Sequence, residues 1–114
     1  MTGKEEALES VRREFAVAEE ARHAGNQGML RVCARRAAGA AVAWWYATRS
    51  APPTKPDAMT QLKALSTDGA VPAEIRDAAS RLTAKVTADF TAPGKADLLA
   101  DSRMIVEYVV GGKV

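Results

Sequence analysis

The chain has 114 residues, of which 47% are hydrophobic and 26% are charged. This length predicts a single domain, and this composition excludes a wholly disordered chain. The formal net charge is +2, from 16 basic and 14 acidic residues, so total charge alone neither requires nor excludes a polyanionic partner.

The first half of the sequence predicts two long helices separated by a short break. Apolar residues recur at the spacing of one helical face and predict a helix over residues 4–24. The break, AGNQG, contains Gly25, which suits a helix C-cap, and Asn26, which suits the following N-cap. A second helix is predicted over residues 27–48.

The second half predicts one short helix and two longer ones. The stretch SAPPTKPD holds three prolines and predicts a loop, and Asp57 at its end suits the N-cap of a short helix over residues 58–65. A further helix is predicted from Pro72 to residue 88, because proline is favoured in the first turn. The last helix is predicted over residues 96–110 and stops at a Gly-Gly pair.

These elements together predict an all-α fold. The segment MIVEYVV is rich in β-branched residues, but its apolar positions keep helical spacing and no second strand is available to pair with it. We therefore predict one domain over residues 1–114, an antiparallel up-and-down helical bundle of four long helices and one short helix.

The second predicted helix has two different halves. Its core side is predicted to carry Met29, Leu30, Cys33, Ala34, Ala37, Ala40, Ala41 and Trp44. The opposite side carries arginines first, and then Val42, Trp45 and Tyr46. A helix that is apolar all round needs cover on every side, from other helices or from a second copy of the chain. We predict a homodimer whose interface uses these last three residues.

Three arginines, Arg31, Arg35 and Arg36, lie near the start of this second helix. One interpretation is that they pair with acidic residues of neighbouring helices, in contacts that add little stability. The other is an anion site, because the first turns of a helix favour negative charge and arginine binds phosphate through paired donors. The nearby aromatic residues are typical of a core rather than of a base-stacking platform.

The sequence offers little catalytic chemistry. With one cysteine and one histidine, Cys33 and His23, a zinc site of the Cys/His type is out of reach. The carboxylates of EEALE and EIRD have a spacing found in metal-binding helical hydrolases, but they also match ordinary surface charge. We predict neither a metal nor a cofactor, and we interpret Cys33 as a packing residue.

Cysteine usage and hydropathy bear on location. A single cysteine excludes an intrachain disulfide framework and favours a reducing, cytoplasmic setting. The first residues contain no apolar signal core, and the longest apolar run has eleven residues, where a membrane span needs about 20. No membrane association is predicted.

Several segments together resemble the HEPN-domain proteins, which are small prokaryotic helical bundles. These segments are GNQG, RVCARRAAG, the proline-rich loop, VPAEIRDAASRLT and DLLADSRMIVEYV. The resemblance implies a helical bundle, frequent homodimers, and a link to nucleotide or RNA chemistry, often beside a nucleotidyltransferase-type protein partner.

Many HEPN proteins cleave RNA without a metal through an R-x(4–6)-H motif in the last helix. Here Arg103 is followed five residues later by Tyr108, and no histidine follows. A tyrosine does not replace an imidazole as a proton shuttle near neutral pH without a large pKa shift.

Three functions are consistent with these patterns. The one we favour is a non-catalytic HEPN-like bundle that homodimerises and binds a protein partner or a nucleotide or other phosphate-containing ligand through Arg31, Arg35 and Arg36. The second is a metal-independent RNA-acting enzyme that uses Arg103 and Tyr108. The third is a simple nucleic-acid-binding protein, for which a wider basic patch is expected.

Overall fold

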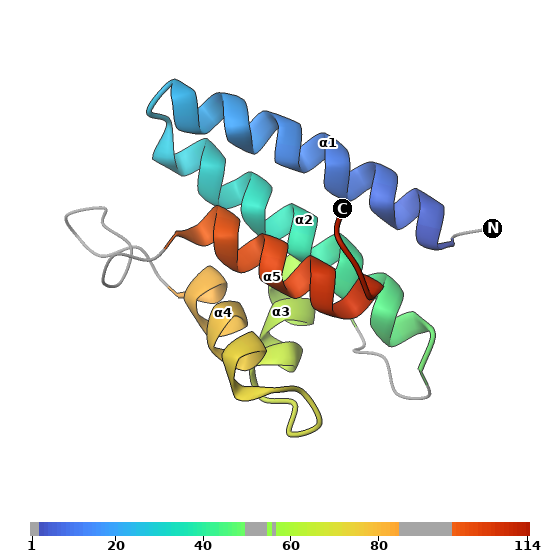
Figure 1. Ribbon diagram of the computed structural model, residues 1–114. Helices are drawn as coiled ribbons and strands as arrows, with labels where there is room; N and C mark the ends of the chain where they lie inside the picture. The colour runs from blue at the N-terminus through green and yellow to red at the C-terminus, as the bar shows by residue number, and fades with distance from the viewer. Residues whose placement is uncertain (1–2, 50–54, 56, 85–96) are drawn as a thin grey trace.

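A computed structural model describes residues 3–49, 55, 57–84 and 97–114, and over these residues all regular structure is helical. The five helices are α1 (Lys4–His23), α2 (Gln27–Ala47), α3 (Ala58–Ser66), α4 (Ala73–Thr83) and α5 (Leu98–Val110) (Figure 1). The predicted all-α bundle is confirmed. None of the described helices is long and apolar enough to cross a membrane.

The N-caps predicted in the AGNQG break and at the end of the proline-rich loop are confirmed by their hydrogen bonds. The Asn26 side chain accepts a hydrogen bond from the backbone of Met29 and begins α2, and Asp57 does the same for α3 through Thr60. Gly25 follows α1 with a φ of 73°, the left-handed conformation that favours glycine. These boundaries depend on residues close together in the sequence.

Helix α2 lies at the centre, with α1 on one side, α3 and α4 on the other, and α5 alongside it (Figure 1). Helix α5 runs in the same direction as α2. The Ser102 hydroxyl donates to the Ala34 carbonyl, 2.8 Å away, near the start of both helices, and the rings of Tyr108 and Trp45 lie 6.0 Å apart near their ends. This connectivity differs from the predicted up-and-down order, because the short α3–α4 hairpin returns the chain to the start of α2.

Helix α4 is shorter than predicted. It ends at Thr83, and Ala84 is already extended, with φ −65° and ψ 145°. The side chain of Arg35, on α2, donates hydrogen bonds to the carbonyls of Leu82 and Ala84, the latter at 3.1 Å. A distant residue therefore binds the carbonyls at this helix end. The rest of the predicted helix, residues 85–88, lies outside the described residues.

The apolar second half of α2 is covered by other helices of the same chain. Val42, Trp45 and Tyr46 are 0%, 9% and 8% exposed and belong to the hydrophobic core, whereas Trp44 is only half-buried. Among the residues predicted for the core side of this helix, Leu30, Cys33, Ala34, Ala37 and Ala41 are buried, whereas Met29 is exposed and Ala40 and Trp44 are half-buried. The three residues predicted to form a dimer interface are buried inside the chain and present no surface to a second copy.

The Tyr46 hydroxyl links the end of α2 to the turn between α3 and α4. It donates to Asp68 Oδ2, 2.8 Å away, and the other oxygen of Asp68 accepts the backbone N–H of Ala70. Burial, followed by the hydrogen bond to Asp68 and its charge, raises the pKa of Tyr46 above its usual value. The hydroxyl thus stays protonated in the folded protein at pH values where it ionises in the unfolded chain.

This link gives a pH-dependent prediction. A group whose pKa is raised on folding stabilises the fold fully below its unfolded pKa, about 10 for tyrosine, and that stabilisation is lost as the pH rises further. We expect Tyr46→Phe to lower the free energy of unfolding by about 1 kcal/mol near pH 8, and this difference to shrink above about pH 10. Urea unfolding of both proteins from about pH 8 to about pH 11.5, a range that crosses the unfolded pKa of tyrosine, checks it. A difference that stays constant over this range would contradict the prediction.

Candidate functional site

The three arginines predicted to form one anion site point in different directions. Arg35 lies across the end of α4, as described above, and burial, followed by the nearby charge of Arg31, lowers its pKa. Arg36 is exposed on another side of α2. Arg31 is half-buried and lies where α2 approaches the start of α5. Arg31 borders a hollow that Arg22 of α1 also lines.

Arg31 belongs to a group of arginines from three helices. An ion pair between Arg22 of α1 and Asp97, 2.9 Å long, lies at the boundary between two neighbouring open depressions of about 260 and 240 Å³. Arg31 borders the first depression and Arg103 the second. We call the region around Arg22, Arg31 and Arg103 the arginine site. Among the described residues, the acidic Glu19 also lies at its edge.

The exposed ion pair at the middle of the arginine site is weak. The side chains of Arg22 and Asp97 are 45% and 54% exposed, and pairs of this kind contribute between nothing and about 1 kcal/mol. An incoming anion therefore displaces little stabilising interaction when it binds Arg22. Among the described residues that line the two depressions, three guanidinium groups stand against the carboxylates of Asp97 and Glu19, an excess of one positive charge.

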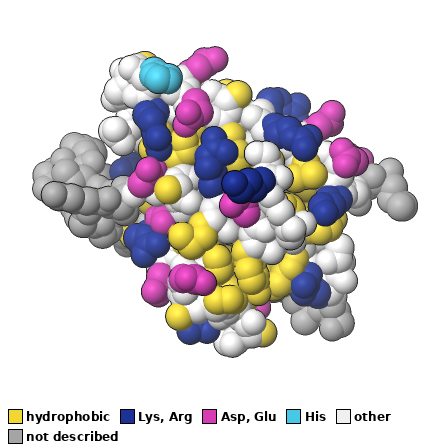
Figure 2. Space-filling view, viewed as in Figure 1, with side chains coloured by type: hydrophobic (Ala, Val, Ile, Leu, Met, Phe, Trp, Pro, Cys, Tyr) yellow, Lys and Arg dark blue, Asp and Glu magenta, His cyan; other side chains and the backbone are white. Residues whose placement is uncertain are grey.

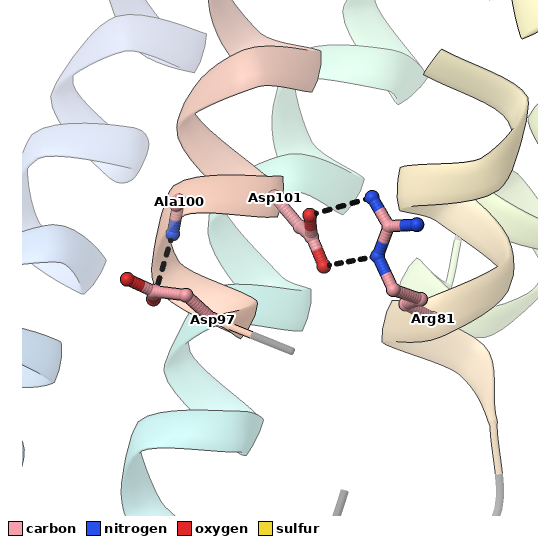
Figure 3. A network of polar contacts seen from close by, with 4 residues as sticks. All are labelled: Arg81, Asp97, Ala100 and Asp101. Carbon is pink, nitrogen blue, oxygen red and sulfur yellow. Dashed lines mark hydrogen bonds and ion pairs between the residues drawn. The ribbon is translucent and has the colours of Figure 1, made fainter. Parts of the chain in front are cut away.

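Asp97 and Asp101, at the start of α5, have different surroundings (Figure 3). Asp97 is the N-cap, and its Oδ1 accepts the backbone N–H of Ala100 at 3.1 Å as well as the hydrogen bond from Arg22. Asp101 is 6% exposed and accepts two hydrogen bonds of 2.9 Å from Arg81 of α4, which raise the pKa of that arginine. The pair formed by Arg81 and Asp101 links α4 to α5 and so holds the N-terminus of α5 beside the arginine site.

Arg103 and Tyr108, predicted as a second group, are not brought together. The guanidinium carbon of Arg103 lies 4.5 Å from the centre of the Phe15 ring on α1, whereas Tyr108 lies beside Trp45 of α2. Five residues along a helix correspond to about 140° of rotation, which separates the two side chains. They therefore do not form a joint site for proton transfer.

Other reactive groups in the described structure are sparse. Cys33 is buried, and burial, followed by a hydrogen bond to Glu14, raises the pKa of its thiol, which disfavours the reactive thiolate. Within residues 3–49, 55, 57–84 and 97–114, no three His, Cys, Asp or Glu side chains are grouped so as to hold a metal ion. The arrangement is suited to binding an anion through arginine.

Basic and acidic side chains alternate over the face on which α1 and α5 lie in view (Figure 2). A broad surface of one sign, as expected for a nucleic-acid-binding protein, is not visible on this face. On this face the charge available to a ligand is therefore local and small, on the scale of one or a few phosphate groups.

In comparisons with known proteins, no family model, no curated protein and no solved structure matches this chain. The resemblance to HEPN-domain proteins therefore stays a prediction.

The sequence patterns did not single out two parts of the site. Arg22 and Asp97 are 75 residues apart and meet only because α1 and α5 run antiparallel to each other. The buried carboxylate of Asp101 has no distinguishing mark in the sequence beyond its place in the first turn of a helix. A search for acidic residues on otherwise apolar helix faces is the signal that could have found Asp101.

Proposed function

We propose that this protein is a non-catalytic helical binding module that holds a phosphate-bearing ligand, such as a nucleotide, at the arginine site. The observation that carries the proposal is the placement of Arg31 and Arg103 on either side of Arg22, from three different helices. Guanidinium groups bind phosphate oxygens through paired, charge-assisted hydrogen bonds. Each of the three side chains projects from a different helix of the bundle.

A catalytic role has less support than binding. Arg103 lies over the ring of Phe15, whereas Tyr108 lies beside Trp45. Cys33 lies in the core. The HEPN-like ribonuclease chemistry considered from the sequence would need a proton shuttle close to the arginine. Tyr108 does not occupy that place in this structure.

The proposal is tested by isothermal titration calorimetry with a nucleoside triphosphate and, separately, with pyrophosphate. Losing one arginine contact to phosphate is expected to weaken binding about tenfold, so Arg31→Gln and Arg103→Gln should each show this loss. Arg13→Gln is the matched control, because Arg13 is exposed on α1 and lines neither depression. Raising the salt concentration should weaken binding to the wild-type protein.

Two results would contradict the proposal. One is that the wild-type protein binds neither ligand at millimolar concentration. The other is that all three variants bind as tightly as the wild type, which would place the ligand elsewhere. Tight, strongly salt-dependent binding of a short RNA with no binding of pyrophosphate would instead favour a nucleic-acid-binding protein.

A further inference from the structure

The carboxylate of Asp97 stands in the middle of the arginine site as an anion of the chain itself. Its Oδ1 atom accepts a hydrogen bond from Arg22 Nη2 at 2.9 Å. The same atom accepts the backbone N–H of Ala100 at 3.1 Å (Figure 3). Phosphate oxygens bind the same two kinds of donor, a guanidinium group and an N–H in the first turn of a helix. The carboxylate therefore occupies the donor of Arg22 that a phosphate oxygen would need.

The two depressions of the arginine site meet at this carboxylate. Arg22 and Asp97 line both of them, whereas Arg31 lines the first and Arg103 the second. The Arg103 guanidinium lies against the Phe15 ring, a contact that supplies no acceptor oxygen. Over the described ranges, neither Arg31 nor Arg103 forms an ion pair. One arginine of the site is thus paired with an acid, and a further arginine lies on each side of that pair.

This arrangement determines which anions gain from binding. A phosphate group that reaches Arg22 alone exchanges one anionic partner of Arg22 for another, so the number of charge-assisted hydrogen bonds does not rise. A net gain comes from Arg31 and Arg103, which border separate depressions. An anion contacts both of them only if its charged groups are linked across the pair of Arg22 and Asp97.

We infer that Asp97 competes with the ligand for Arg22, and that the site selects a linked chain of two or three phosphate groups over a single phosphate. This inference rests on the proposed function and adds the class of ligand. On binding, Arg22 exchanges Asp97 for the middle of the phosphate chain, while the ends of the chain contact Arg31 and Arg103. Asp97 keeps the N–H of Ala100 and so still caps α5.

The ligand class is tested by isothermal titration calorimetry with orthophosphate, pyrophosphate and tripolyphosphate. The better of the two longer ions is expected to bind the wild-type protein at least about tenfold more tightly than orthophosphate, because it gains a further guanidinium contact. A preference that comes only from the larger charge of the longer ions would persist without either flanking arginine. A preference that needs both depressions should fall below about threefold in Arg31→Gln and in Arg103→Gln.

The outcomes separate this inference from the proposed function. If orthophosphate binds as tightly as the longer ions, the inference is overturned and the anion site stands. A preference that persists in both arginine variants overturns it in the same way. If the wild-type protein binds none of the three ions at millimolar concentration, the proposed function itself is contradicted, and the inference is contradicted with it.

Asp97→Asn tests the competition for Arg22. Asparagine caps a helix about as well as aspartate, so the circular dichroism spectrum and the melting temperature should stay unchanged. Loss of the exposed ion pair should tighten binding of the preferred ion about fivefold. Glu19→Gln is the matched control, since it also removes an acid from the site but one that forms no ion pair within the described part of the chain. Its gain should be about twofold at most, because salt screens an unpaired exposed charge.

A double-mutant cycle shows whether the gain depends on Arg22. In an Arg22→Gln protein, the added change Asp97→Asn should tighten binding less than about twofold, because no guanidinium is released. The competition is overturned if Asp97→Asn and Glu19→Gln give equal gains. It is also overturned if Asp97→Asn gives its full gain without Arg22.

Discussion

Replacing Gly39 by alanine is expected to lower the free energy of unfolding by about 2 kcal/mol. Gly39 lies in the middle of α2, where alanine normally stabilises a helix by about 1 kcal/mol relative to glycine. Here a Cβ atom would stand 2.5 Å from Cβ and 2.7 Å from Cα of Ala58, at the start of α3. The two backbones would have to move apart, and the cost of this overpacking exceeds the gain in helix propensity. Urea unfolding measures the difference.

Two variants make this prediction specific. Gly28→Ala, in the first turn of the same helix, has only the Asn26 side chain near it, at 3.8 Å, and should leave stability unchanged or raise it by up to about 1 kcal/mol. Ala58→Gly removes Cβ but leaves the Cα atom of position 58 2.7 Å from the new methyl group, so the double variant with Gly39→Ala should recover only part of the loss. A Gly39→Ala protein as stable as the wild type would show that α2 and α3 separate at little cost.

The contact at Gly39 illustrates what the sequence could and could not predict about the fold. The caps formed by Asn26 and Asp57 are local, and the first residues of the helices they begin were predicted correctly, while the last residues differ by one. The need for glycine at position 39 depends on Ala58, nineteen residues away on a different helix (58 − 39). The end of α4 similarly depends on Arg35, 47 residues from Leu82. Contacts between residues of different helices cannot be predicted from the spacing of apolar residues along one helix.

The orientation of α2 was the main error in the sequence analysis. Its second half is apolar all round, so the spacing of the apolar residues does not show whether Trp44 or Trp45 faces the core. In the structure Trp45 is fixed by an edge-to-face contact with Tyr46, by the nearby ring of Tyr108 and by the guanidinium of Arg49, 3.7 Å from its ring centre. Trp44 is left at the surface, with the Lys4 ammonium 5.9 Å from its ring.

The candidate site was predicted in part. Arg31 and Arg103 were both named, but in two separate groups, and only the antiparallel packing of α1 and α5 brings them to either side of Arg22. Arg35 was expected to bind an anion and instead binds two carbonyls. An arginine near the start of a helix is suited to either role, and the choice is made by the segment that packs against it.

Removing the carboxylate of Asp101 is expected to cost about 3 kcal/mol, the largest loss predicted for this chain. Asp101→Ala deletes two charge-assisted hydrogen bonds and leaves the Arg81 guanidinium without its acceptor beside α5. The loss lies at the lower end of the range for buried pairs, because the Arg81 side chain is 37% exposed and regains some hydration. The carboxylate also stands in the first turn of α5, where the helix dipole favours negative charge. Thermal or urea unfolding reports the change.

The matched control for this prediction is Asp77→Ala, since Asp77 is an exposed acid of α4 that affects the pKa of Arg81 only through its charge. Its loss should cost less than about 0.5 kcal/mol. Replacing the whole pair, Arg81→Met with Asp101→Leu, should restore most of the stability, because no uncompensated buried charge then remains. If Asp101→Ala and Arg81→Met proved additive, the two side chains would contribute separately. The start of α5 would then be held beside the arginine site by apolar packing, with the ion pair adding no stability of its own.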